Sequence, residues 1–333
     1  MPSKTPPNHV SGGAVDVNPA RAAKLDQAVR GQLDGSFDHI SEVLASRLGR
    51  DLEGITEFRT RLRAGPVSPW VFGLYSKLVA ELSKNEADKA AMTYRDVTYA
   101  SSLPAAPGLI ELGEDAIASS WWDHYCLLLD TDRGHRFQFR PPRTEDAQSC
   151  RREVERAMGL LSEADPELHD ELSHLLRMIV VGGSDSSRGF DGASTFFFWG
   201  AILLNAEARR DSIGTIDRLV HEASHVLLFG LSAAGPLTKN DGGERYASAL
   251  RADARPIEGI FHACFVTTRV NLAIRRLLES RVLTTTEEKS AVTRLDFNGQ
   301  AAQASLDTLS QHAMLTELGE EIYAELNRYW SEN

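Results

Sequence analysis

The sequence predicts an α+β fold that is mainly helical with a small β-sheet, and three observations support this prediction. Apolar residues recur at three- and four-residue spacing over most of the chain, which is the period of an amphipathic helix. A short apolar and aromatic run, FFFWGAILL (residues 196–204), is typical of a buried strand. A loop rich in glycine and serine, residues 182–194, separates that strand from the helices before it.

Composition limits the function classes. The chain has 333 residues and a net charge of −11, which argues against nucleic acid as the main partner because phosphate binding needs a cationic surface. The longest apolar run has nine residues, far fewer than the roughly 20 needed to cross a bilayer, so no membrane partner is expected. The three cysteines form no C-x-x-C pair, and the N-terminus has no apolar signal-peptide core. Together these features predict a soluble cytoplasmic protein.

Three regions are expected along the chain. Residues 1–18 are rich in Pro, Ser, Asn and Gly and are predicted to be disordered. Residues 19–105 form a helical N-terminal region that braces the core, and residues 106–333 form an HExxH metal-binding catalytic domain. Within that domain, HYCLLLDTDRGHRFQFRPP (residues 124–142) predicts two strands joined by a turn.

The segment RLVHEASHVLLFG carries the pattern H-E-x-x-H at His221, Glu222 and His225. Two histidines four residues apart lie on one face of a helix, which we expect to run from residue 212 to residue 229 and to end at Gly230. The segment is otherwise mostly apolar, and burial of two imidazoles and a carboxylate costs several kcal/mol unless they have partners. A metal ion is such a partner, so the motif predicts a metal site.

A third ligand is expected from a second helix. Pro256 is suited to the first turn of a helix that runs to about Ser280. His262 lies in an apolar part of that helix and is the preferred third ligand, while Glu258 is the rival. The metal site is thus predicted between two core helices.

Three arginines near these segments are candidate cofactor-binding residues: Arg251, Arg255 and Arg269. An arginine beside a metal can bind a carboxylate with two parallel hydrogen bonds. A peptidase does not need several such residues, whereas an enzyme that chelates a small dicarboxylate does. Arg255 directly precedes the helix-starting proline, so its charge adds to the positive end of that helix dipole.

Residues 178–276 resemble the HExxH-motif domain family found beside genes for ribosomally made and modified peptides (RiPPs). The run R-P-x-x-G-x-x-H-A, residues 255–263, is the most specific part of this resemblance. Members of that family are iron(II)- and 2-oxoglutarate-dependent peptide β-hydroxylases. The resemblance implies that His221, His225 and His262 hold iron, that Arg255 or Arg269 binds the distal carboxylate of 2-oxoglutarate, and that the substrate is a precursor peptide.

Besides the oxygenase, two other functions remain open at this point. The first is a zinc metallopeptidase, in which the same motif would bind zinc and Glu222 would act as general base; in the oxygenase, Glu222 would instead orient a ligand or a water molecule. The second is a helical interaction module without metal. For either enzyme, the strand at residues 196–204 is a candidate to pair with an extended peptide substrate.

Overall fold

The computed structural model describes residues 13–130, 136–185, 189–208, 210–250 and 253–332. Within these ranges the chain forms two compact units, and each is assembled from segments far apart in sequence. The first unit draws on Met1–Ala22, Arg152–Leu172 and Arg210–Asn333, and the second on Ala23–Arg151 and Ser173–Arg209. The sequence analysis divided the chain into consecutive regions with boundaries near residues 18 and 105, since a linear scan of composition does not detect interleaved segments.

The predicted mainly helical α+β class with a small sheet is confirmed. The helices of the described residues are α1 (Pro19–Leu48), α2 (Ile55–Ala64), α3 (Trp70–Ser83), α4 (Ala87–Ala100), α5 (Ser119–Leu129), α6 (Thr144–Ala164), α7 (Pro166–Leu175), α8 (Ser212–Leu231), α9 (Ile257–Ser280), α10 (Thr285–His312) and α11 (Glu317–Glu332). The strands are β1 (Gly108–Glu111), β2 (Phe139–Arg140), β3 (Met178–Ser184), β4 (Gly192–Ser194) and β5 (Ala201–Asn205).

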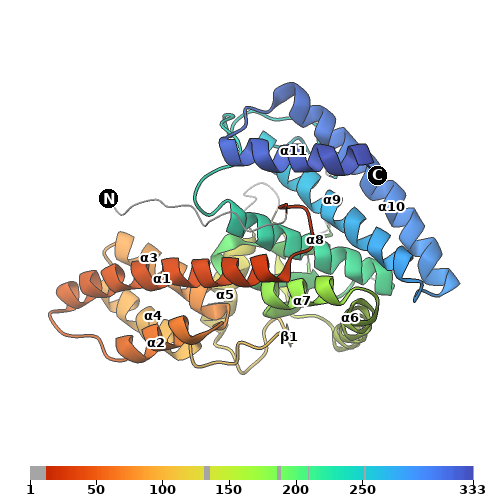
Figure 1. Cartoon of the computed structure of the whole chain (residues 1–333). Coiled ribbons are helices and arrows are strands. Elements are labelled where there is room, and N and C mark those ends of the chain that lie inside the picture. Colours follow the sequence, from red (N-terminus) through yellow and green to blue (C-terminus); the bar gives the residue numbers. More distant parts are fainter. Residues whose placement is uncertain (1–12, 131–135, 186–188, 209, 251–252, 333) are drawn as a thin grey trace. The chain divides into compact units, whose positions relative to one another are not determined.

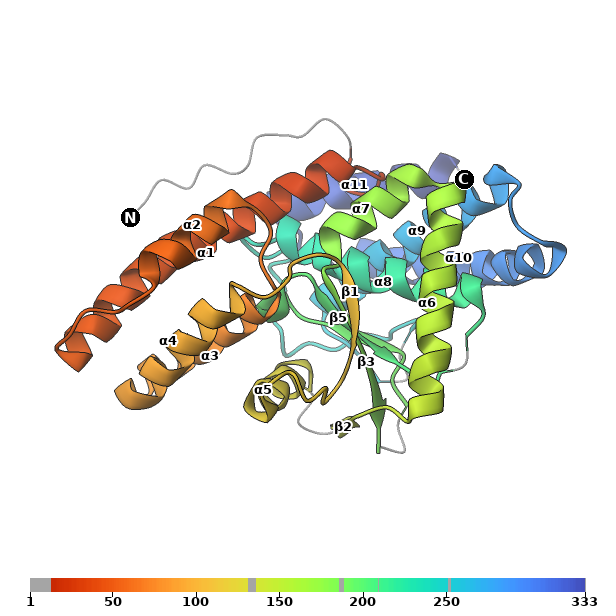
Figure 2. The same ribbon diagram turned by 90° about the horizontal axis from the view of Figure 1, so that it is seen from below.

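The second unit contains the sheet, in the order β1-β3-β5-β4, with β2 paired to the end of β3 (Figure 2). Strands β1, β3 and β5 are parallel, whereas β4 runs antiparallel to β5. All five residues of β5 are buried, as are the first six of β3. Such continuous apolar runs are expected for strands that are covered on both faces.

The predicted strand at residues 196–204 is only partly correct. Its first residues, Phe196–Phe198, form a turn of 3₁₀ helix, and the strand is restricted to Ala201–Asn205. Phe198 is fully buried, and its ring lies directly against the backbone of Gly73 in α3, where a side chain would not fit. Since β5 pairs with β3 on one side and with β4 on the other, it has no edge to offer a peptide.

The prediction of two strands in residues 124–142 is wrong in its first half. Residues Ser119–Leu129 form α5, and only Phe139–Arg140 are extended as β2. The apolar face of α5 begins at Trp121 and Trp122, before the run that suggested a strand, and continues at Tyr125. These aromatic side chains pack around Trp70, so the helical period is completed by residues outside the short window.

The first unit is a group of helices in which α9 packs against α8, α10 and α11 (Figure 1). Helix α8 begins at an N-cap, Asp211, whose carboxylate accepts a hydrogen bond from the Gly214 N–H at 2.7 Å. It continues one residue past Gly230, the predicted end, and is followed by Ser232. Helix α9 occupies nearly the range predicted from its sequence. In the described ranges, no helix is both long and apolar enough to span a bilayer.

Candidate metal centre

The H-E-x-x-H motif lies in the second half of α8, as predicted. His221 and His225 are half-buried, and their ring centroids are 5.0 Å apart. Glu222 is almost completely buried, with 2% of its surface exposed. The neighbouring Leu219, Val220 and the residues after His225 form the apolar core between the helices of the first unit. The motif therefore presents two partly accessible imidazoles beside a buried carboxylate.

The third predicted ligand, His262, meets the motif from α9. Its Nδ1 is 3.3 Å from Nδ1 of His225, and the two ring centroids are 5.5 Å apart. The ring of Phe229, one turn after His225, lies 5.4 Å from the His262 ring. Desolvation lowers the pKa of His262, although Glu258 acts in the opposite direction. The neutral imidazole is the form that binds metal ions.

The spacing of these nitrogens is compatible with metal ligation. Two ligand nitrogens that are each about 2.0–2.1 Å from a tetrahedral metal lie about 3.3 Å from one another. In the part of the chain that the structure describes, however, no three His, Cys, Asp or Glu side chains surround a common point as they stand. Binding of one metal by His221, His225 and His262 would therefore need their side chains to be rearranged.

Arg218 is a neighbour of the motif that sequence reasoning missed. Its guanidinium lies 3.6 Å from the Glu222 carboxylate, and 19% of the Arg218 side chain is exposed. An opposite charge at this distance offsets part of the cost of burying a carboxylate. The i, i+4 spacing of opposite charges on a predicted helix is the signal that identifies the pair.

The rival ligand, Glu258, is engaged elsewhere. Its carboxylate accepts a hydrogen bond from the Thr238 hydroxyl at 2.8 Å, in the loop that follows α8. Glu258 lies one turn before His262 on α9, so the two side chains are neighbours on the same face. Of the two candidates, the structure brings His262 to the motif, whereas Glu258 fixes the adjoining loop.

The candidate arginines lie in different environments. Arg255 forms an ion pair with Asp253 at 2.9 Å, and its backbone pairs with that of Tyr246. Within the described residues, Arg255 Nε is buried without a hydrogen-bond partner. Arg251 lies outside the described residues. The positive end of α9 thus carries one half-buried arginine, which is partly neutralised by its own neighbour.

Arg269 has a different place from the one expected of a cofactor ligand. Only 2% of its side chain is exposed, and Glu171 of α7 forms an ion pair with it. Four of its five N–H groups donate hydrogen bonds within the protein. The acceptors are the Ser224 hydroxyl, the Val15 and Asp16 carbonyls and the Glu171 carboxylate. This geometry favours a structural role for Arg269, because its donors already point at groups of the protein.

No known family model matches the chain, and no curated protein shows significant similarity to it.

Proposed function

We propose that this protein is an iron(II)- and 2-oxoglutarate-dependent dioxygenase that hydroxylates a β-carbon in a ribosomally made precursor peptide. The observation that carries the proposal is the approach of His262 on α9 to His225 on α8, with a separation of 3.3 Å between their Nδ1 atoms. The next helix along the chain thereby brings a third imidazole close to the H-E-x-x-H pair. This donor chemistry is suited to iron as well as zinc.

Each residue of the motif has a role in this proposal. His221, His225 and His262 would hold the metal through neutral imidazoles. Bound iron(II), together with 2-oxoglutarate and O₂, supplies the oxidant needed to hydroxylate an unactivated C–H bond. Glu222 forms an ion pair with Arg218 and has 3% of its side chain exposed. It would orient a ligand histidine and balance the charge of the metal, as a buried carboxylate beside a metal site does.

Arg255 is the better candidate for the distal carboxylate of 2-oxoglutarate. Its Nε is a buried donor without a protein partner in the described ranges, and 31% of its side chain is exposed. A buried N–H that lacks an acceptor costs about 1–3 kcal/mol, and a ligand carboxylate would remove that cost. Arg269, in contrast, would have to give up hydrogen bonds to the protein before it could bind an acid.

A zinc metallopeptidase is the alternative, and the motif alone supports it. In such an enzyme Glu222 must accept a proton from a metal-bound water. Glu222 is almost inaccessible and its carboxylate is paired with Arg218, so a metal-bound water has little access to it, which favours an orienting role. The oxygenase is therefore the function we prefer.

The experiment is to load the protein with iron(II) without air, add 2-oxoglutarate and then O₂, and measure succinate. A zinc-loaded sample and the His221→Ala variant are the controls, and mass spectrometry of added precursor peptide detects a gain of one oxygen atom. Succinate that depends on both iron and O₂, with an oxidised peptide, is the expected result. No succinate, together with peptide fragments from the zinc-loaded sample, would show that the protein is a peptidase.

A further inference from the structure

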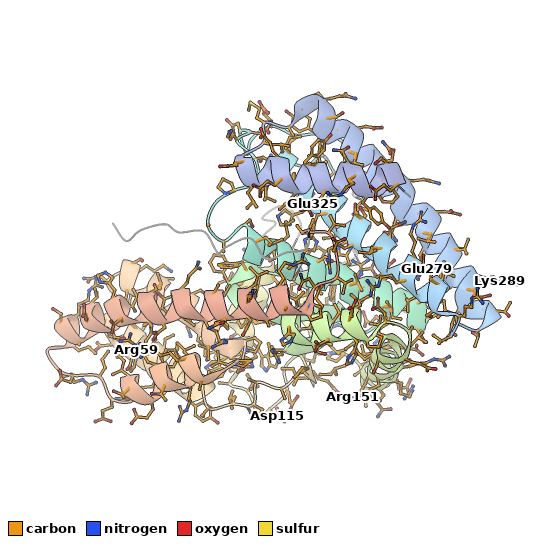
Figure 3. All side chains as sticks on the ribbon, in the orientation of Figure 1. Arg59, Asp115, Arg151, Glu279, Lys289 and Glu325 are labelled. Atoms are coloured by element: carbon orange, nitrogen blue, oxygen red, sulfur yellow. The ribbon has the colours of Figure 1, made fainter. Side chains whose placement is uncertain are left out.

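The backbone segment before α1 is bound to the helices that carry the candidate metal site. Residues 13–18, which we call the N-terminal strap, fall within the predicted disordered region, yet their polar backbone groups have specific partners. Arg21 donates to the carbonyl of Gly13, and Arg269 donates to those of Val15 and Asp16. The Val15 N–H donates to the Glu325 carboxylate on α11 at 3.1 Å. Figure 3 labels Glu325. The Asn18 N–H donates to the Glu171 carboxylate, so two arginines and two glutamates hold the strap in place.

The same guanidinium that holds the strap also contacts the motif helix. Arg269 Nε donates to the hydroxyl of Ser224 at 3.2 Å, and Ser224 directly precedes His225. Its Nη1 donates to the carbonyls of Val15 and Asp16 at 2.7 and 2.9 Å. Its Nη2 donates to Glu171. With these acceptors on three sides, the planar guanidinium has one orientation available.

Two polar side chains on one face of α9 thus contact α8. His262 and Arg269 are seven residues apart, which is close to two full helical turns. His262 contacts His225, and Arg269 contacts the adjacent Ser224. We propose that Arg269 is a positioning residue for the metal site. Held by the N-terminal strap and Glu171, it fixes the Ser224–His225 segment of α8 at the distance from α9 at which His225 and His262 share a metal.

The charges explain why the strap is needed for this role. Arg21 and Arg269 are both buried, and Glu171 is the carboxylate that bonds both of them. Glu325 and Asp16 also act favourably on the charge of Arg21. A buried charge without sufficient partners is strongly unfavourable, so each guanidinium also needs hydrogen-bond acceptors. The strap carbonyls supply the missing acceptors. If the strap left, Arg269 would lose two of its hydrogen bonds and with them its fixed orientation toward Ser224.

The test rests on the proposed metal site and uses cobalt(II) as the probe, in the full-length protein. Ser224→Ala removes only the hydroxyl that Arg269 contacts, and Arg269→Lys keeps the charge but loses the planar group. The matched control is Arg276→Gln. Arg276 lies seven residues further along α9 and donates hydrogen bonds to Asp165 and Glu167 around the start of α7. Within the described residues, these hydrogen bonds do not involve α8 or the strap. The readouts are the cobalt Kd, the visible d–d spectrum and the thermal unfolding midpoint. The cobalt titrations are made at a temperature well below the unfolding midpoint of every variant.

We expect Ser224→Ala and Arg269→Lys to weaken cobalt binding by about 10-fold or more, the range found for residues that orient metal ligands, and to alter the d–d bands. Arg276→Gln should retain the wild-type Kd and spectrum. If Ser224→Ala lowers the thermal midpoint but keeps the cobalt Kd within about twofold of wild type, Arg269 is only a structural cation and the inference is wrong. If wild type and His221→Ala fail equally to bind cobalt, the proposed metal site is itself wrong, and both proposals fall.

Discussion

Glu171→Gln tests the buried charge cluster of the first unit most directly. Glu171 is fully buried on α7 and bonds Arg269, Arg21 and the N–H of Asn18. Glutamine has nearly the same volume, so no cavity is created. It removes the negative charge, however, and places an NH₂ group where a carboxylate oxygen accepted hydrogen bonds. Two buried guanidinium groups then face each other without the carboxylate that separates them.

The expected loss follows from this geometry. Removal of one partner from a buried ion pair costs about 3–5 kcal/mol, because an uncompensated charge is left behind. Native domains have a free energy of unfolding of about 5–15 kcal/mol, so the variant loses a large share of its stability. For a cooperative unit of about 150–250 residues, 1 kcal/mol corresponds to about 2–4 °C, which predicts a fall in Tm of roughly 6–20 °C.

The assay is urea unfolding followed by circular dichroism at pH 7, with the free energy extrapolated to water. Glu167→Gln is the matched control, since Glu167 lies on the same helix and pairs with Arg276 while 70% of its side chain is exposed. An exposed pair of this kind contributes at most about 1 kcal/mol. A loss below about 1 kcal/mol for Glu171→Gln would refute the reasoning, because the two arginines would then not depend on this charge.

Three further predictions concern the same unit. Gly319→Ala should lower stability by about 1–3 kcal/mol, because the added Cβ would overlap the Leu237 carbonyl oxygen. Gly299→Ala should raise Tm slightly, because its Cβ would only make van der Waals contact with the Trp330 ring on a helical backbone. Equal effects would contradict this. Hydrogen bonds from Thr284 hold the pKa of Glu287 below its ordinary value of 4.5. This contribution is present above pH 4.5 and is lost as pH falls through the lowered value, so Glu287→Gln should destabilise the protein near pH 7 and match wild type in strong acid. A constant difference across urea titrations from pH 7 to 2 would exclude this linkage. His262→Ala should abolish metal content measured by elemental analysis, and Glu258→Ala should leave it intact; the reverse result would favour a glutamate-ligand peptidase.

The sequence predicts elements best where a helix carries its own period and cap. The motif helix and α9 were located to within a few residues, since apolar spacing and Pro256 mark them. The short segments were harder. The first of the two strands expected in residues 124–142 is the end of helix α5, because the tryptophans that complete its apolar face precede the apolar run. The two interleaved units leave no signature in local composition.

For the candidate site, spacing identified the residues that share a helix but not the partners that come from elsewhere. His262 was a candidate because it is polar within an apolar segment, and its contact with His225 depends on how α8 and α9 pack. Arg269 looked like a cofactor ligand because an arginine near a metal can bind a carboxylate. Its actual partners, the strap carbonyls and Glu171, lie too far away in sequence for any local pattern to reveal them.

The N-terminal strap has a consequence for the order of events during synthesis. Val15 is 254 residues from Arg269, the side chain that holds its carbonyl, and 310 residues from the Glu325 carboxylate that accepts its N–H. At about 5–20 residues per second, a ribosome needs roughly 13–50 s between making the strap and making Arg269. During that interval the Val15 and Asp16 carbonyls must wait for the guanidinium that binds them. The full set of strap contacts can therefore form only after Glu325 has been made.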